Sequence, residues 1–121
     1  MAPSSDAEST IAIAEFVKRL RPDPRTGFLT LRALVVSLGP DVVERVTPSA
    51  VVYARRDKPF LKVEALRATR LAVAFPASIS PDDAMGRLLR RGDERYFRLE
   101  KPDDLDGHCQ EFVRKAYAAA R

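Results

Sequence analysis

Three short stretches of alternating residues follow one another closely in the middle of the chain, and they constrain the fold more than any other feature. Residues 49–56 and 60–64 are rich in β-branched and aromatic side chains, and the segment 57–59 between them contains a proline. This pattern predicts two strands joined as a hairpin. Residues 70–75 alternate in the same way and predict a third strand. The connections are too short for parallel crossovers, so neighbouring strands should pair antiparallel.

Helical patterns flank this strand-rich middle. Apolar residues recur at the spacing of one helix face in residues 11–20, 28–38 and 105–116. Prolines and a glycine in residues 21–27 predict a loop between the first two helices. Residues 40–46 begin with a proline that fits a first helical turn, which predicts a further short helix.

A second strand-forming region follows a segment of mixed signals. Residues 78–92 contain both a helix-start pattern and a turn pattern, and predict one helical turn within a long loop. Residues 95–99 alternate again and predict a fourth strand. The fold class is therefore α+β: N-terminal helices, an antiparallel β-meander of four to five strands, and a C-terminal helix packed on one face of the sheet.

The composition is that of one soluble domain. The 121 residues, 45% hydrophobic and 31% charged, suit a single folded unit over residues 1–121. Residues 1–9 are small and polar, so we expect them to be flexible and to carry no export signal. A single cysteine and the lack of a long apolar run favour the cytoplasm and no membrane insertion. Both a monomer and a homodimer remain open.

The densest set of metal-ligand side chains lies near the C-terminal helix. Asp104, Asp106 and His108 would allow a metal-assisted hydrolase, since Asp104 and His108 are four residues apart. Acids after a proline are more often the first turn of a helix, which they stabilise through its dipole. Cys109 falls on the apolar stripe, where a thiol is usually inert. The sequence leaves enzymatic activity open, but it nominates no catalytic residue, no metal and no cofactor.

The one regional bias is basic. Residues 55–98 hold eleven basic and six acidic side chains, and arginines there are interleaved with aromatic residues. Guanidinium groups beside aromatic rings could hold phosphates or stacked bases. Arginine outnumbers lysine 16 to 5 throughout the chain, so a coding bias is an alternative origin. The candidate ligand-binding residues are Tyr53, Arg56, Arg70, Tyr96 and Arg98.

The order of motifs also resembles a bacterial family catalogued as domain of unknown function 5655, over about residues 31–120. The stretches that carry the resemblance are Leu31–Thr47, Val51–Arg56, Pro59–Val63, Arg70–Pro76 and Pro102–Asp106. The chain departs from the family in one loop, where Arg90–Glu94 replaces a segment of Gly-Trp type.

This resemblance implies an accessory or recognition role, because members of the family are labelled predicted transport proteins or occur beside endonuclease-like domains. It carries over no catalytic residue. We therefore expect a non-enzymatic binding or accessory domain with a nucleic-acid or protein partner. The alternative is phosphate or nucleic-acid binding through the central arginine-rich segment.

Overall fold

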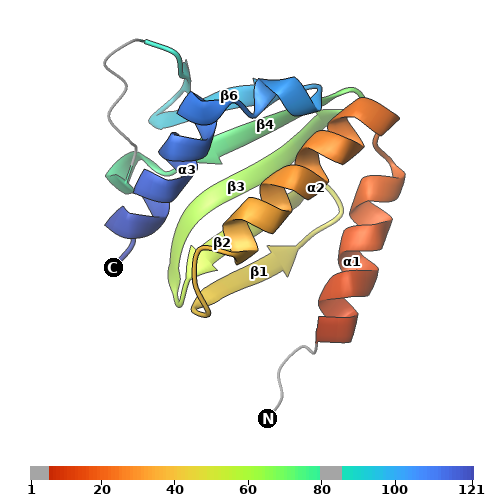
Figure 1. The fold of residues 1–121 in the computed structure, drawn as a ribbon, viewed down its shortest axis with the longest axis horizontal. Coiled ribbons are helices and arrows are strands. Elements are labelled where there is room, and N and C mark those ends of the chain that lie inside the picture. Colours follow the sequence, from red (N-terminus) through yellow and green to blue (C-terminus); the bar gives the residue numbers. More distant parts are fainter. Residues whose placement is uncertain (1–5, 80–85) are drawn as a thin grey trace.

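The computed structural model describes residues 6–79 and 86–121 (Figure 1). In chain order the elements are α1 (Asp6–Lys18), α2 (Pro22–Val36), β1 (Val42–Val46), β2 (Ala50–Arg55), β3 (Lys58–Arg67), β4 (Arg70–Phe75), η1 (Ala77–Ile79), β5 (Leu89–Arg91), β6 (Glu94–Leu99), η2 (Pro102–Asp104) and α3 (Gly107–Ala119). This order confirms an α+β fold with helices on both sides of a strand-rich middle.

The strands of the described residues form one antiparallel sheet in the order β1-β2-β3-β4-β6-β5. β1 to β4 follow each other through short turns, which confirms the predicted meander, and the described part holds six strands where four to five were expected. β3 is the longest strand. Its ten residues place its two turns about 30 Å apart.

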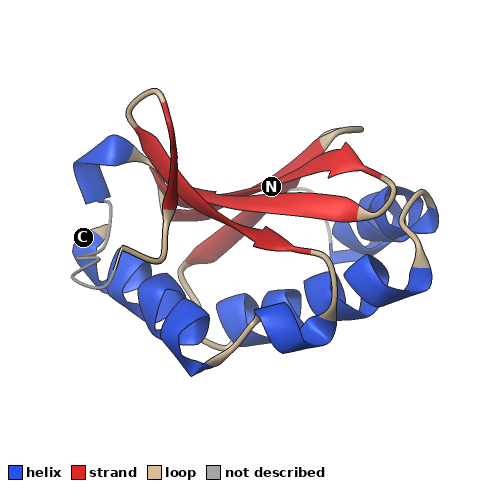
Figure 2. Cartoon of the chain, turned by 90° about the horizontal axis from the view of Figure 1, so that it is seen from above, coloured by secondary structure: helices blue, strands red, loops and turns tan. Residues whose placement is uncertain are grey.

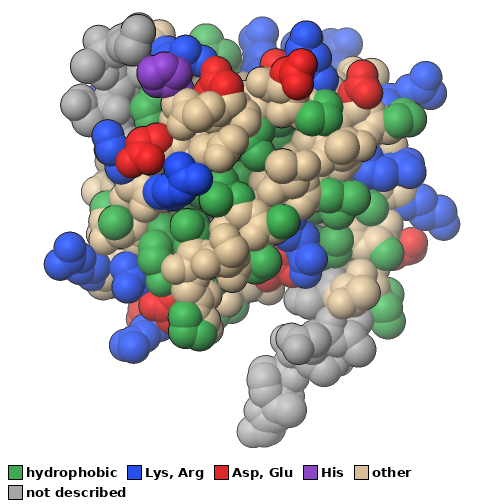
Figure 3. Space-filling view, in the orientation of Figure 1, with side chains coloured by type: hydrophobic (Ala, Val, Ile, Leu, Met, Phe, Trp, Pro, Cys, Tyr) green, Lys and Arg blue, Asp and Glu red, His purple; other side chains and the backbone are tan. Residues whose placement is uncertain are grey.

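All three α-helices lie on one side of the sheet, and none of them covers the other side (Figure 2). Viewed from the helix side, hydrophobic side chains fill the space between helices while charged side chains lie mostly around the margin (Figure 3). No helix in the described ranges is long and apolar enough to cross a membrane. Fully buried core residues include Phe28, Leu31 and Val35 of α2, Val51 and Tyr53 of β2, Leu61 and Val63 of β3, and Leu71, Val73 and Phe75 of β4.

The start of α2 differs from the sequence prediction, because residues 21–27 are helical from Pro22 rather than a loop. Pro22 and Pro24 occupy the first turn, where a backbone N–H has no partner within the helix and proline is tolerated. Gly27 lets α2 lie close to the sheet, since a Cβ there would be 3.2 Å from Cδ1 of Leu99. The residues that suggested a loop instead begin the helix and allow its close packing.

β1 also corrects the sequence prediction, because residues 42–46 form an edge strand and not a short helix. Three of its five residues are valine, which favours a strand. The strand pairs with β2, with Glu44 opposite Tyr53. This pairing outweighs the preference of the preceding proline for a first helical turn.

The segment predicted as a long loop with one helical turn, residues 78–92, is partly regular. The 3₁₀ turn η1 begins it and the edge strand β5 ends it, while residues 80–85 lie outside the described residues. β5 pairs with β6 across a turn where Gly92 has a φ of 63°. Glycine suits this left-handed conformation because it has no Cβ.

Helices stand at the start and near the end of the described residues. α1 begins at Asp6, and residues 1–5, which belong to the segment 1–9 expected to be flexible, lie outside the described part. At the C-terminal end, the predicted last helix is confirmed as α3, with Asp106 as its N-cap and the short turn η2 before it.

Candidate functional site

The helix-free side of the sheet carries the side chains that alternate with the core residues. Along one row, Lys62 of β3 lies opposite Ala74 of β4, which lies opposite Tyr96 of β6. In the next row, Glu64 lies opposite Ala72. Ala72 and Ala74 are only 0% and 1% exposed although no helix covers them. The longer side chains of β3 and β6 therefore cover a floor of alanines.

Three of these longer side chains, Lys62, Glu64 and Glu94, form an ion-pair network with Arg91 of β5. Nζ of Lys62 lies 3.7 Å from Oε2 of Glu94, and Nη2 of Arg91 lies 2.8 Å from Oε1 of Glu64 and 3.3 Å from Oε1 of Glu94. The two carboxylates raise the pKa of Arg91. Its guanidinium carbon is also 5.7 Å from the ring centroid of Tyr96. The network is neutral, and it occupies one side of the Tyr96 ring.

Three arginines gather near the turn between β3 and β4, and we call them the arginine cluster: Arg67, Arg70 and Arg98. Arg67 lies directly opposite Arg70 in the register of β3 and β4. Arg98 lies opposite Ala72, which is two residues from Arg70 on the same side of β4. Arg70 and Arg98 are therefore diagonal neighbours, a relation that places residues about 7–8 Å apart.

One carboxylate compensates part of this charge, because Nε of Arg70 is ion-paired with Oε2 of Glu100. Neither Arg67 nor Arg98 makes a side-chain hydrogen bond or ion pair within the part of the chain that the structure describes. The arginine cluster therefore has an excess of two positive charges. Like charges that face each other across strands are destabilising, and an anion bound between them would remove that cost. A guanidinium fork matches the paired oxygens of a phosphate.

Three of the five ligand-binding candidates, Arg70, Tyr96 and Arg98, share the helix-free side. Arg70 and Arg98 are neighbours there, whereas Tyr96 lies opposite Ala74, four residues along β4 from Arg70. Arg56 lies in the turn at the opposite end of β3. Arg67 was not among the five candidates. It lies beyond the strand predicted at residues 60–64; extending that strand to Arg67 would have placed it opposite Arg70 across a two-residue turn.

Tyr53, the fifth candidate, is fully buried in the core and offers no surface to a ligand. Its hydroxyl donates to Oε2 of Glu44 at 2.7 Å, and Arg32 donates to both oxygens of the same carboxylate at 2.8 and 3.0 Å. Burial, together with the charge of Glu44, raises the pKa of Tyr53. We call Arg32, Glu44 and Tyr53 the triad; it joins α2, β1 and β2, and the Arg32 side chain keeps 31% of its surface exposed.

The carboxylates that suggested a metal site cap helical turns. Asp104 accepts two backbone N–H groups at 2.8 and 3.1 Å, and Asp106 accepts the backbone N–H of Cys109 at 3.0 Å, which lowers the pKa of Asp106. Burial raises the pKa of the Cys109 thiol to about 12. His108 is exposed. Across residues 6–79 and 86–121, no group of three His, Cys, Asp or Glu side chains is placed to hold a metal ion.

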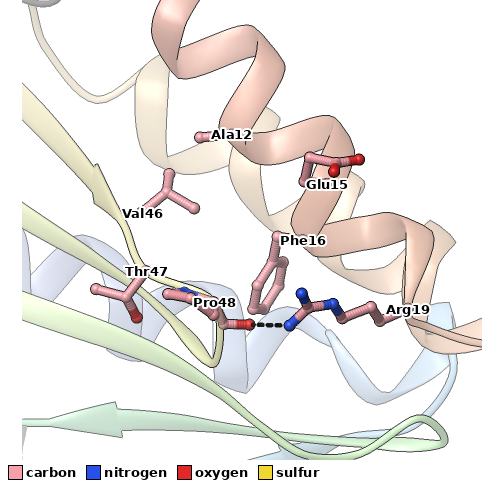
Figure 4. Close-up of a pocket in the computed structure, with 7 residues that line it drawn as sticks. All are labelled: Ala12, Glu15, Phe16, Arg19, Val46, Thr47 and Pro48. Atoms are coloured by element: carbon pink, nitrogen blue, oxygen red, sulfur yellow. Dashed lines mark hydrogen bonds between the residues drawn. The ribbon is translucent and has the colours of Figure 1, made fainter.

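A groove of about 210 Å³ lies between α1 and the β1–β2 turn (Figure 4). Phe16 forms its floor, and Nη1 of Arg19 donates to the carbonyl of Pro48 at 3.2 Å across one end. This volume is below the range of roughly 300–1,000 Å³ typical of small-molecule sites. The groove is therefore a packing seam that holds α1 against the sheet.

Fold and surface together define an α+β domain on a half-covered antiparallel sheet, with an arginine cluster on its exposed face. The chain belongs to the family described as Domain of unknown function (DUF5655), whose model matches residues 13–120. This match confirms the family resemblance read from the sequence motifs. Comparison with curated proteins and with solved structures gave no match.

Proposed function

We propose that this chain is a non-enzymatic binding domain of the bacterial cytoplasm, and that its arginine cluster binds the phosphate groups of single-stranded nucleic acid. One observation supports this most. Arg67 faces Arg70 across two strands, Arg98 is a diagonal neighbour of Arg70, and Glu100, which pairs with Arg70, is the one carboxylate that the described residues place on the cluster. An exposed sheet face suits a flexible anionic chain, because the backbone phosphates of a single strand can adapt to its surface.

The expected binding mode depends on phosphate contacts more than on the bases. Arg91 already lies against the Tyr96 ring, so stacking of a base on that ring would have to displace the guanidinium from the ion-pair network. Phosphate contacts carry no sequence information directly. We therefore expect modest affinity, little preference among sequences and a strong dependence on salt.

Titration of the protein with short labelled single strands of DNA and RNA, and with a duplex, tests this proposal by fluorescence anisotropy. Three phosphate contacts on a single strand should give a slope of about −2 for log K against log salt, so affinity should fall roughly 15-fold between about 50 and 200 mM salt. An absence of binding even at the lowest salt would refute the proposal.

Substitutions in the arginine cluster test whether the nucleic acid binds there. The double variant Arg67→Gln/Arg98→Gln should weaken single-strand binding by at least about tenfold, because it removes two charge-assisted contacts. The matched control is Arg45→Gln/Lys115→Gln, which changes the net charge equally at two exposed sites, on β1 and α3. The control should stay within about twofold of the wild type, since those residues lie away from the cluster. Equal losses in both double variants would show a general charge effect and not a site.

A further inference from the structure

A second site lies at the opposite end of β3 from the arginine cluster. A pocket of about 360 Å³ opens between the β2–β3 turn and the C-terminal end of α3. Its charged lining residues are Asp41, Arg55, Arg56, Asp57, Lys58 and Arg121. The volume is within the range of roughly 300–1,000 Å³ that small ligands occupy. Four of these six side chains are cationic, so the pocket favours an anion.

One of the two carboxylate side chains that line the pocket, Asp41, already has two partners. Oδ2 of Asp41 accepts from Nε of Arg55 at 2.9 Å, and Oδ1 accepts from the hydroxyl of Tyr117 at 2.6 Å. The guanidinium carbon of Arg55 also lies 4.2 Å from the ring centroid of Tyr117. These three side chains satisfy one another and form a fixed wall, so Asp41 does not neutralise the other cations of the pocket.

Two cations of the turn have no carboxylate side chain as a partner within the described residues. Arg56 makes no side-chain hydrogen bond or ion pair within the described residues, and Nζ of Lys58 donates to the main-chain oxygen of Arg121. Both line the pocket from neighbouring positions of one turn. A guanidinium and an ammonium together match the double charge of a phosphate monoester.

The backbone of Arg56 carries strain at this point. Its φ of 60° is the only positive φ of a non-glycine residue in the part of the chain that the structure describes. It is the first of the two residues that connect β2 and β3, a position where glycine would adopt this conformation without cost. Strained residues of this kind gather where a side chain has a function. The arginine here places a guanidinium at the pocket at the expense of stability.

We propose that this pocket binds a small phosphate monoester, with Arg56 and Lys58 as its phosphate ligands and the Asp41, Arg55 and Tyr117 group as its wall. The site is separate from the nucleic-acid surface, because the ten residues of β3 hold the two about 30 Å apart. The experiments on the pocket and on the arginine cluster can therefore support or refute each proposal separately.

The experiment uses three probes, inorganic phosphate, glycerol 3-phosphate and ribose 5-phosphate, titrated to millimolar concentration and followed by the amide NMR shifts of residues 56–58. Arg56→Gly should weaken binding by at least about tenfold while raising the melting temperature by a few degrees, because glycine removes the strain. Arg56→Gln keeps a side chain at positive φ, so it should lose the same affinity without the gain in melting temperature.

Arg45→Gln serves as the control, since it removes one exposed arginine from another strand and should leave probe binding unchanged. Loss of affinity in both Arg56 variants supports the site. Unchanged affinity in either variant, or no shift of these amides with any of the three probes, overturns it. Oligonucleotide binding by the Arg56 variants should equal that of the wild type, which separates this site from the arginine cluster.

Discussion

Glu44 connects more of the structure than any other single side chain of β1. Its carboxylate accepts from Arg32 of α2 and from Tyr53 of β2, and its side chain is only 9% exposed. A carboxylate with so little exposure is stabilising only while its partners remain, because an unpaired and poorly solvated charge or donor costs free energy. The triad therefore fixes how α2 sits on the β1–β2 edge of the sheet.

We predict that Glu44→Ala lowers the free energy of unfolding by about 2–4 kcal/mol, since it leaves Arg32 and the Tyr53 hydroxyl without their partner. Tyr53→Phe removes one hydrogen bond and should cost about 1 kcal/mol. Urea unfolding measures both. Arg45→Ala, an exposed neighbour, should stay within about 0.5 kcal/mol of the wild type. A Glu44 variant less damaging than the tyrosine variant would contradict this account.

The role of Tyr53 shows which residue-level features the sequence reveals. Alternation along β2 places Tyr53 on the same side as Val51, so its burial follows from a pattern that the sequence contains. Its partner could not be found, because Glu44 lies in the segment predicted as a helix. Without a strand there, no register relates Glu44 to Tyr53, and the tyrosine remained a candidate for ligand binding.

Among the elements, the β5–β6 hairpin depends most on side chains for its position. β5 has three residues, all exposed, and lies at the edge of the sheet. Arg91 joins it to β3 through Glu64, whereas Arg90 beside it makes no ion pair within the described residues. The ion-pair network therefore ties a short edge hairpin to the centre of the sheet.

We predict that Arg91→Ala makes the amides of β5 and of its turn with β6 exchange faster with solvent, while the global free energy of unfolding changes by less than about 1 kcal/mol. Exposed ion pairs contribute little to global stability, but the end of a sheet opens locally. Arg90→Ala removes the same charge from the same strand and should leave amide exchange unchanged. Equal effects of the two variants would show that the ion-pair network does not hold the hairpin.

The helices and strands that could be predicted from the sequence are those whose apolar residues repeat at a regular spacing. The strands of the meander and the last helix repeat over enough residues for their period to be recognised. The start of α2 was not predicted, because Pro22 and Pro24 are typical of a loop, although the first turn of a helix tolerates both. β1 was missed because its conformation depends on pairing with β2, which is a tertiary contact that propensity does not contain.

For the molecule as a whole, Asp41 links distant parts of the chain. It lies before β1, pairs with Arg55 of β2 and accepts the hydroxyl of Tyr117, which is 76 residues away in α3. Asp106 has a comparable role at the other end of α3, where it caps the helix. Two carboxylates therefore hold the first and last turns of the same helix.

The sequence contains enough information to pair two residues of the arginine cluster, but not to place the third beside them. Arg67 and Arg70 flank a two-residue turn, so a hairpin there already makes them face each other. Arg98 joins them only because β6 inserts between β4 and β5, and that strand order is a property of the complete sheet. The basic segment in the sequence thus predicted that the helix-free side of the sheet is rich in arginine. It did not predict that these arginines divide between a neutral ion-pair network and the positively charged arginine cluster.

The two helix-end carboxylates also set how the fold responds to acid. The hydroxyl of Tyr117 and then the guanidinium of Arg55 lower the pKa of Asp41, and the backbone N–H of Cys109 lowers the pKa of Asp106. A carboxyl whose pKa is lower in the folded protein stabilises the fold above its unfolded pKa of about 3.9. This stabilisation is lost as the pH falls through the folded pKa.

We therefore predict that the urea midpoint is nearly constant from about pH 7 to pH 5 and falls steeply below about pH 4. The double variant Asp41→Asn/Asp106→Asn should start from a lower midpoint at neutral pH and lose less on acidification, because two of the carboxylates that must be protonated are absent. Asp93→Asn, at an exposed carboxylate of the β5–β6 turn, should keep the wild-type slope. Were the double variant to lose stability as steeply as the wild type below about pH 4, the acid response would have to come from other carboxylates.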